Sequence, residues 1–365
     1  MTARAALSFR ATAEEYKEQA KALFNAVLAD DESAHWRFKW QHPRFRDQPV
    51  SAVRGTTLSP GDAQIVTARE YHFDNWVELM RFAEAVAEDG PVTRFEEAAE
   101  AVVAGDAPRL RAMLREWPEL AHARSTRRHH ATLLHYVAAN GVEDSRQKTP
   151  PNAVEIAGIL LDAGADPDAL ADMYDERCTT LSMLVSSAHP HGAGLQAELA
   201  ETLLDRGAAL EGPGTEWQSA LRTALVFGYA DTAETLVARG AKIGIVEAAG
   251  LGRADEVRRL LPGAGEADRH AALALAAQLG HADVVRLLLD AGADPNRYNP
   301  PGFHAHATPL HQAVLSDNDE VVRLLVERGA RLDVKDKVYE GTPLDWALHD
   351  EREATASYLR EKGAG

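Results

Sequence analysis

The hydrophobic positions between Thr308 and Ala330 follow helical spacing twice, with a polar break between the two runs. Thr308 followed by Pro309 predicts a helix start, because threonine caps helix N-termini and proline fits the first helical position. The polar sequence SDND predicts a turn, and Gly329 predicts the end of the second helix. Each helix is short and apolar on one face only, so the pair must be buried against similar pairs.

The same pattern recurs along most of the chain. Copies begin at Thr342, Ala271 and Ser219, and weaker copies begin at Ile245, Thr179, Thr132 and Phe95. With the Thr308 copy we count eight units. The glycines that end such copies are expected at positive φ, where a Cβ is penalised: Gly164, Gly292 and Gly329.

The sequence Thr-Pro-Leu-His with a Gly-Ala-Asp type of ending is specific for ankyrin repeats. The chain therefore resembles an ankyrin-repeat protein over roughly its last three quarters. The resemblance implies an all-α ankyrin-repeat solenoid, in which helix pairs are joined by β-hairpin fingers. We expect the solenoid to occupy residues 92–365 in about eight units.

Residues 1–91 are predicted to form a helical region that caps the first repeat. Helical spacing runs from Thr12 to Ala29 and resumes at Asp62, whereas residues 48–61 indicate a loop. A bare terminal repeat would expose its apolar face to water, so we expect this region to form one body with the repeats.

Two features of residues 1–91 suggest their origin. The spacing from Asp31 to Pro43 equals that from Asp106 to Pro118, which favours a decayed repeat. The stretch DAQIVTAREYHFDNW, with later phrases such as NPPGFHAHATPLHQAV, is similar to a large bacterial family of uncharacterised ankyrin-repeat proteins. This resemblance implies a bacterial cytosolic protein but no established reaction.

Charge and cysteine content narrow the function classes. The net charge of −17 disfavours a nucleic-acid binder, which needs a basic surface. Cys178 is the only cysteine, so no internal disulfide forms. The sequence has no signal-peptide pattern and no run of about eighteen apolar residues, which predicts a soluble, cytoplasmic monomer that does not enter a membrane.

No catalytic, nucleotide-binding or zinc-binding signature occurs in the sequence. We therefore predict no cofactor and no metal. His304 and His306 would share one face of an extended segment, but a zinc site requires further ligands that the sequence does not identify. His135 and His311 occupy the fourth position of the Thr-Pro-Leu-His phrase, where the resemblance implies a structural hydrogen-bonding role.

The candidate binding residues lie on fingers, the segments that join one repeat to the next. We call these the first finger (124–131), the second (165–179), the third (293–307) and the last (330–341). The expected binding residues are Arg127, Arg128, His129, His130, Tyr174, Tyr298, Phe303, His304, His306 and Tyr339. The arginine and histidine run is either a solvated loop or an electropositive wall that attracts a small anionic ligand or an acidic partner segment.

The uneven length of the fingers suggests a cleft. The second and third fingers are long, whereas the copies from Ser219 and Ile245 are followed by almost none. A concave surface with a gap between long fingers would accept a ligand, although fingers also shorten by drift. Two insertions, residues 141–152 and 187–196, are expected to pack on each other at the opposite end of the helices.

Two function classes follow from the sequence. The first is a recognition module that binds a protein or peptide partner through its concave face, with aromatic and arginine anchors. The alternative is a small-molecule-binding protein or enzyme, with a pocket lined by His, Arg and Tyr and histidine as general acid and base.

Overall fold

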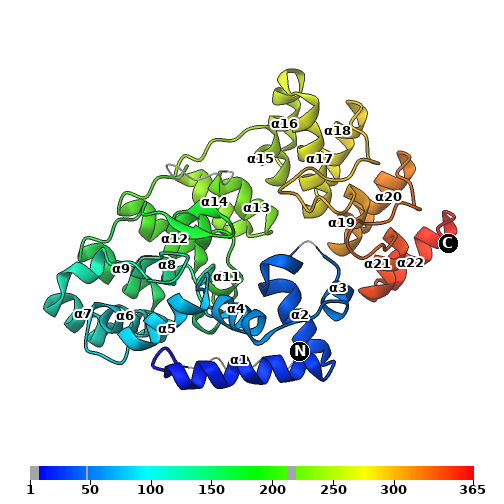
Figure 1. Cartoon of the computed structure of the whole chain (residues 1–365). Helices are drawn as coiled ribbons and strands as arrows, with labels where there is room; N and C mark the ends of the chain where they lie inside the picture. The colour runs from blue at the N-terminus through cyan, green and yellow to red at the C-terminus, as the bar shows by residue number, and fades with distance from the viewer. Residues whose placement is uncertain (1–7, 47, 212–218) are drawn as a thin grey trace. The chain divides into compact units, whose positions relative to one another are not determined.

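The structure is a computed structural model that describes residues 8–46, 48–211 and 219–365. The chain forms two compact units, Met1–Trp217 and Gln218–Gly365, and both are mainly helical (Figure 1). The predicted boundary at residue 91 lies inside the first unit and stays a prediction. Among the described residues, no helix combines the length and the apolar character needed to cross a bilayer.

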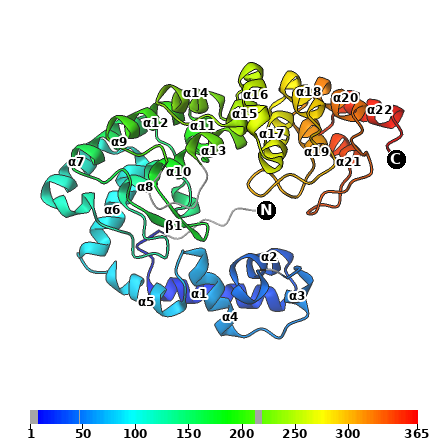
Figure 2. The same cartoon turned by 90° about the horizontal axis from the view of Figure 1, so that it is seen from above.

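The first unit begins with a group of helices that pack on one another. They are α1 (Ala13–Leu28), α2 (Glu32–Gln41), the short 3₁₀ helix η1 (Pro43–Phe45), α3 (Ser51–Arg54), α4 (Pro60–Glu70) and α5 (Trp76–Ala85). Helix α1 lies along α4, and α2 also contacts α4 (Figure 2). Thr12 caps α1 with a capping box to Glu15. Helix α3 is a single turn inside the segment predicted as loop, and it buries Val53 in the core formed with α1 and α4.

The equal spacing noted in the sequence corresponds to equal local structure. Asp31 caps α2 and Asp106 caps α7 (Ala107–Glu116), each through its side chain. A 3₁₀ helix then starts at Pro43 in one case and at Pro118 in the other, where η2 (Pro118–Ala121) follows α7. That the N-terminal region is a decayed repeat stays a prediction.

Three helix pairs complete the first unit. They are α6 (Pro91–Ala104) with α7, α8 (Leu133–Val137) with α9 (Ala153–Asp162), and α10 (Thr180–Leu184) with α12 (Gln196–Asp205). The 3₁₀ helix η3 (Asp144–Arg146) lies in the insertion after α8, and α11 (Ala188–Gly192) lies in the insertion after α10. Helix α8 contacts α6 and α10, and α9 contacts α7 and α12, so the pairs stack in order.

The second unit consists of five further pairs in its described residues. They are α13 (Ala220–Val226) with α14 (Ala230–Ala238), α15 (Ile245–Gly250) with α16 (Ala254–Leu260), α17 (Glu266–Leu279) with α18 (Ala282–Asp290), α19 (Pro309–Leu315) with α20 (Asp319–Glu327), and α21 (Pro343–His349) with α22 (Glu353–Glu361). The 3₁₀ helix η4 (Leu261–Gly263) follows α16. Figure 2 shows α16, α18, α20 and α22 in a row, with α17, α19 and α21 beside them.

The predicted register of the pairs is confirmed at their ends. Gly164, Gly292 and Gly329 have φ values of 94°, 84° and 90°. Each directly follows the C-cap residue of an outer helix, so the left-handed conformation turns the chain into the next finger. Thr308 caps α19 and Pro309 occupies its first turn, as expected.

Most fingers are not β-hairpins, contrary to the expected form. Within the described ranges, one two-stranded sheet occurs, in which β1 (Ala171–Met173) pairs antiparallel with β2 (Glu176–Cys178). The first finger has a single bridge between Arg124 and Thr132. The third and last fingers are built from turns, because their proline, glycine and aspartate residues favour turns over extended strands.

Candidate functional site

The first finger does not form an exposed electropositive wall. Arg127 is 3% exposed and His129 is 1% exposed, so neither is available at the surface. The side chains of Arg127 and His129 turn inward because carboxylates from two other segments lie behind the finger. Arg128 is half-buried and His130 is exposed.

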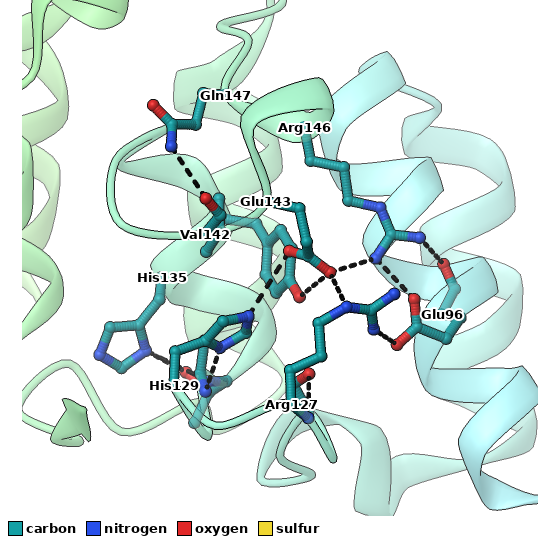
Figure 3. A network of polar contacts seen from close by, with 12 residues as sticks. Glu96, Arg127, His129, His135, Val142, Glu143, Arg146 and Gln147 are labelled. Carbon is teal, nitrogen blue, oxygen red and sulfur yellow. Dashed lines mark hydrogen bonds and ion pairs between the residues drawn. The ribbon is translucent and has the colours of Figure 1, made fainter. Parts of the chain in front are cut away.

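A buried network of ion pairs surrounds Arg127 (Figure 3). Its guanidinium contacts Glu96 of α6, and its Nε lies 2.7 Å from Oε1 of Glu143. Arg146 contacts the same two carboxylates, at 2.6 Å from Oε2 of Glu96 and 3.1 Å from Oε1 of Glu143. Two arginines therefore share two carboxylates, and Glu100 at the edge adds a contact of 2.8 Å to Arg146.

The network keeps its members charged although they are buried. Burial raises the pKa of Glu143, but the neighbouring Arg127, His129 and Arg146 outweigh it and hold that pKa well below its usual range. Burial lowers the pKa of Arg127, yet Glu143 and Glu96 raise it above its ordinary value. Two arginines matched by two glutamates stabilise the fold, because removal of one of these side chains would leave a buried charge without a partner.

Aromatic side chains of the N-terminal region cover the network. The guanidinium of Arg127 lies 4.5 Å from the ring centre of Phe82 and 5.5 Å from that of Phe73. Arg146 lies 5.6 Å from the ring centre of Phe9. The N-terminal region and the segments that carry the two arginines thus meet around these guanidiniums.

The insertion 141–152 lies only partly where the sequence predicts. Its first half supplies Glu143 and Arg146 to the first finger and to α6. At its end, Asn152 donates to the carbonyl of Gly105 (3.0 Å) in the turn between α6 and α7, which is the end of the helices opposite the fingers. The buried charges explain this path, because each requires a partner of opposite sign. The insertion 187–196 contacts the chain just after α8 through Ser187, whose hydroxyl donates to the carbonyl of Ala139 (3.3 Å).

Tyr174 lies at the turn of the second finger and is exposed, as expected of a finger residue. Its hydroxyl donates to Oδ1 of Asn140 at 2.6 Å, so the finger folds onto the end of the preceding inner helix. Next to it, Asp172 pairs with His130 at 2.9 Å. The second finger is therefore held to the first one, and Tyr174 does not extend freely into solvent.

The two histidines of the Thr-Pro-Leu-His phrase have the structural role that the resemblance implied. Nδ1 of His135 lies 2.9 Å from the Thr132 hydroxyl, and its Nε2 lies 3.3 Å from the carbonyl of Cys178. His311 repeats the arrangement with Thr308 at 2.8 Å and with the carbonyl of Gly341 at 3.1 Å. Each ring thus ties a helix start to the following finger.

The last finger contains a loop, residues 333–341, that is organised by one carboxylate. Asp336 is 2% exposed and accepts hydrogen bonds from the amides of Val338 (2.8 Å), Tyr339 (2.7 Å) and Gly341 (2.9 Å). It also accepts one from Nε1 of Trp346 at 3.0 Å. Burial raises the pKa of Asp336, but these four donors outweigh it and lower the pKa to about 2. We call residues 333–341 the Asp336 loop.

The Asp336 loop presents two apolar side chains to solvent. Tyr339 is 76% exposed and Val338 is 60% exposed. The backbone amides of Val338 and Tyr339 both donate to Asp336, so the backbone that carries these two side chains is held in one conformation. Exposed apolar groups on a rigid loop are typical of protein interaction surfaces.

Rings of the third finger adjoin this loop. His306 lies 6.4 Å from Tyr339, 5.9 Å from Trp346 and 6.3 Å from His304, measured between ring centres. The hydroxyl of Tyr298 donates to the carbonyl of Lys335 at 2.6 Å. Four of the predicted residues are thus brought together, namely Tyr298, His304, His306 and Tyr339. We call these four residues, together with Val338 and Trp346, the Tyr339 surface.

Two expectations for the third finger are wrong. Phe303 is buried and not available for binding. His304 is not in an extended segment, because its φ is 59° and the chain turns there with a hydrogen bond from Ala307 N to its carbonyl (3.0 Å). The pKa of His304 is lowered by burial and by His306, although the carbonyl of Val226 favours the charged ring.

Comparison with known families identifies part of the chain. The family model "Ankyrin repeat" matches residues 268–300, and "Ankyrin repeats (3 copies)" matches residues 298–365. Residues 268–365 are ankyrin repeats. No curated protein matches the chain.

The Tyr339 surface lies entirely within the ankyrin repeats that the family models match. The first and second fingers lie outside the matched residues. In the described part of the chain, no group of three or more His, Cys, Asp or Glu side chains is arranged to hold a metal ion.

Sequence reasoning missed the residues that build both sites. Glu96, Glu143 and Arg146 belong to segments whose contact with the first finger has no local signal. Asp336 had a local signal, because an aspartate followed within five residues by glycine often forms a side-chain to backbone turn.

Proposed function

We propose that the chain is a recognition module whose ankyrin repeats bind a protein or peptide partner through the Tyr339 surface. Ankyrin repeats generally act as protein interaction modules, which supports this class of function. The observation that carries the choice of surface is the Asp336 loop, which holds Val338 and Tyr339 exposed on hydrogen-bonded backbone.

The physical argument rests on entropy and area. A tyrosine at the centre of an interface contributes a large apolar area with few rotatable bonds. A loop that is already ordered loses little conformational freedom on binding, so more of the contact energy appears as affinity. Val338 and Tyr339 combine both properties, and His306 and Trp346 extend the same ring-rich area.

The test uses peptides selected for binding to the full chain from a random display library. The affinity of a selected peptide is measured by fluorescence polarisation for the natural protein and for the double variant Val338→Ser/Tyr339→Ala. Loss of two interface anchors should weaken binding by at least about tenfold. Leu348→Ser is the matched control, because Leu348 is 42% exposed in the same repeat but lies on α21 outside the loop.

A second variant separates the rigid loop from the side chains it presents. Asp336→Asn replaces two acceptor oxygens by one, so the four donors are no longer all satisfied, whereas Val338 and Tyr339 are retained. We expect weaker peptide binding with the helices intact by circular dichroism. The proposal fails if no peptide is enriched, or if the Val338→Ser/Tyr339→Ala variant binds like the Leu348→Ser control.

A further inference from the structure

Three arginines of the first unit gather where the N-terminal helices meet the first two fingers. The backbone amide of Arg128 donates to the carbonyl of His72 at 2.8 Å. The backbone amide of His72 donates in turn to the carbonyl of Arg69 at 3.0 Å. Arg46 forms an ion pair with Asp175 at the turn between β1 and β2. Segments far apart in the sequence therefore hold Arg46, Arg69 and Arg128 together, and we call these three residues the arginine group.

Two members of the arginine group lack an acidic partner. Among the residues that the structure describes, neither Arg69 nor Arg128 has a carboxylate within ion-pair distance. The chain has 56 acidic and only 39 basic side chains, so most arginines can find a carboxylate. Both side chains are half-buried, which removes part of the solvation that would otherwise stabilise the charge.

Among the charges that act most strongly on Arg128, two are positive and two are negative, so with Arg128 itself the positive charges outnumber the negative ones by one. Its pKa is lowered by burial first and by Arg69 next, whereas Asp74 and Asp175 act in the opposite direction. The arginine group supplies three positive charges against these two carboxylates. His72 adds none near neutral pH, because burial lowers its pKa to about 3, and His130 is engaged by Asp172.

We propose that the arginine group binds a carboxylate, supplied by an acidic side chain of a partner or by a small carboxylate ligand. One carboxylate between Arg69 and Arg128 would neutralise the excess charge of the described residues. The planar guanidinium forks match the two oxygens of a carboxylate in a bidentate arrangement. This site lies in the first unit and does not rest on the function proposed for the Tyr339 surface.

Stability distinguishes a binding site from a structural cluster. If the arginines stabilised the fold, their removal would lower the unfolding midpoint. Two neighbouring cations without partners repel each other, so neutralising one should leave the midpoint unchanged or raise it. The test variants are Arg69→Gln and Arg128→Gln, each of which retains a long polar side chain.

Binding is measured by isothermal titration calorimetry with the full chain at low ionic strength. The probes are a capped hexaglutamate peptide, succinate and inorganic phosphate, with capped hexaglutamine as the neutral control. Arg81→Gln is the matched protein control, because Arg81 is exposed on α5 and its loss changes the net charge equally. Salt should weaken binding of the charged probes.

We expect the peptide or succinate to bind the natural protein, and Arg69→Gln and Arg128→Gln each to weaken binding about tenfold. Binding of the peptide alone assigns the carboxylate to a partner segment, and binding of succinate assigns it to a small ligand. The Val338→Ser/Tyr339→Ala variant should bind these probes normally, which separates this site from the Tyr339 surface. The proposal is overturned if no carboxylate binds, if phosphate binds instead, if Arg81→Gln weakens binding equally, or if the arginine variants lose stability.

Discussion

Replacing Glu143 by Gln should strongly destabilise the first unit. Glu143 is the carboxylate that Arg127 and Arg146 share, at 2.7 and 3.1 Å, and its side chain is almost completely buried. Glutamine fills the same volume but carries no charge, so two buried guanidiniums would share only Glu96. Loss of one partner from a buried ion pair costs about 3–5 kcal/mol.

Glu100→Gln is the matched control for this prediction. Glu100 contacts the same Arg146 at 2.8 Å, but its side chain is 45% exposed and water screens the interaction. Its loss should therefore cost at most about 1 kcal/mol. The two substitutions change the same chemical group beside the same arginine. They differ in burial and in the second partner of Glu143, Arg127.

Hydrogen exchange followed by mass spectrometry is the appropriate assay, because the two compact units need not unfold together. Peptides from α6 and the first finger should lose protection in Glu143→Gln, whereas peptides from α17 to α22 should exchange as before. The double variant Arg127→Met/Glu143→Gln should recover part of the lost protection, since Glu96 and Arg146 then remain as one carboxylate paired with one guanidinium.

The pH dependence of the unfolding free energy gives an independent check that the charge of Glu143 is stabilising. The pKa of Glu143 is held well below its ordinary value of 4.5, so its contribution to stability is present above that pH. It is lost as pH falls below 4.5, and the difference between the natural protein and Glu143→Gln should shrink there. If Glu143→Gln lowers the free energy of unfolding by no more than Glu100→Gln does at pH 7, the buried ion pairs do not stabilise the first unit.

Three further outcomes are expected. Deletion of residues 1–91 should cause aggregation or lower the unfolding midpoint, because aromatic rings of that region cover the buried network; an equally stable monomeric truncation would show independent bodies. Gly292→Ala and Gly329→Ala should each cost ~1 kcal/mol in urea unfolding, because alanine is strained at positive φ; a neutral result at both would contradict the assigned helix ends. Burial lowers the pKa of His135 from 6.5 to about 4, so between pH 7.5 and 5 the unfolded chain binds a proton that the folded chain does not, and the free energy of unfolding should fall by about 2 kcal/mol. The pKa of His311 is also lowered, so this residue acts in the same direction. An unfolding midpoint that does not change over this range would refute the buried, uncharged state of both histidines.

The helix pairs were predictable because their signals are local. Thr308, Pro309 and Gly329 specify the ends of two helices through capping and backbone preference, without reference to distant residues. Apolar spacing then identifies the face that each helix buries. The structural role of His311 was instead implied by the resemblance to ankyrin repeats, and the threonine it contacts lies only three residues away.

The burial of Arg127 was not predictable in the same way. Its partners Glu96 and Glu143 lie 31 and 16 residues away in sequence, and the second belongs to an insertion that the repeat pattern does not specify. A run of arginine and histidine on a finger is compatible with an exposed surface until the positions of these carboxylates are known. Long-range ion pairs leave no periodic signal in a single sequence.

The Tyr339 surface falls between these two cases. That tyrosine and histidine side chains would gather on fingers was predictable from residue type and repeat position. Their spacing was not, because it depends on turns at His304 and Asp336 that replace the expected extended hairpins.

The first and last fingers use buried charge in opposite ways. Arg127 is neutralised by carboxylates, so the first finger is fixed by contacts that require this side chain to face inward. Asp336 is instead satisfied by three backbone amides and one indole, all of them uncharged donors within the same repeat. The carboxylate therefore rigidifies its loop without using the outward side chains. This leaves the side chains of Val338 and Tyr339 exposed on an ordered loop, which supports the choice of this loop for the proposed interaction surface.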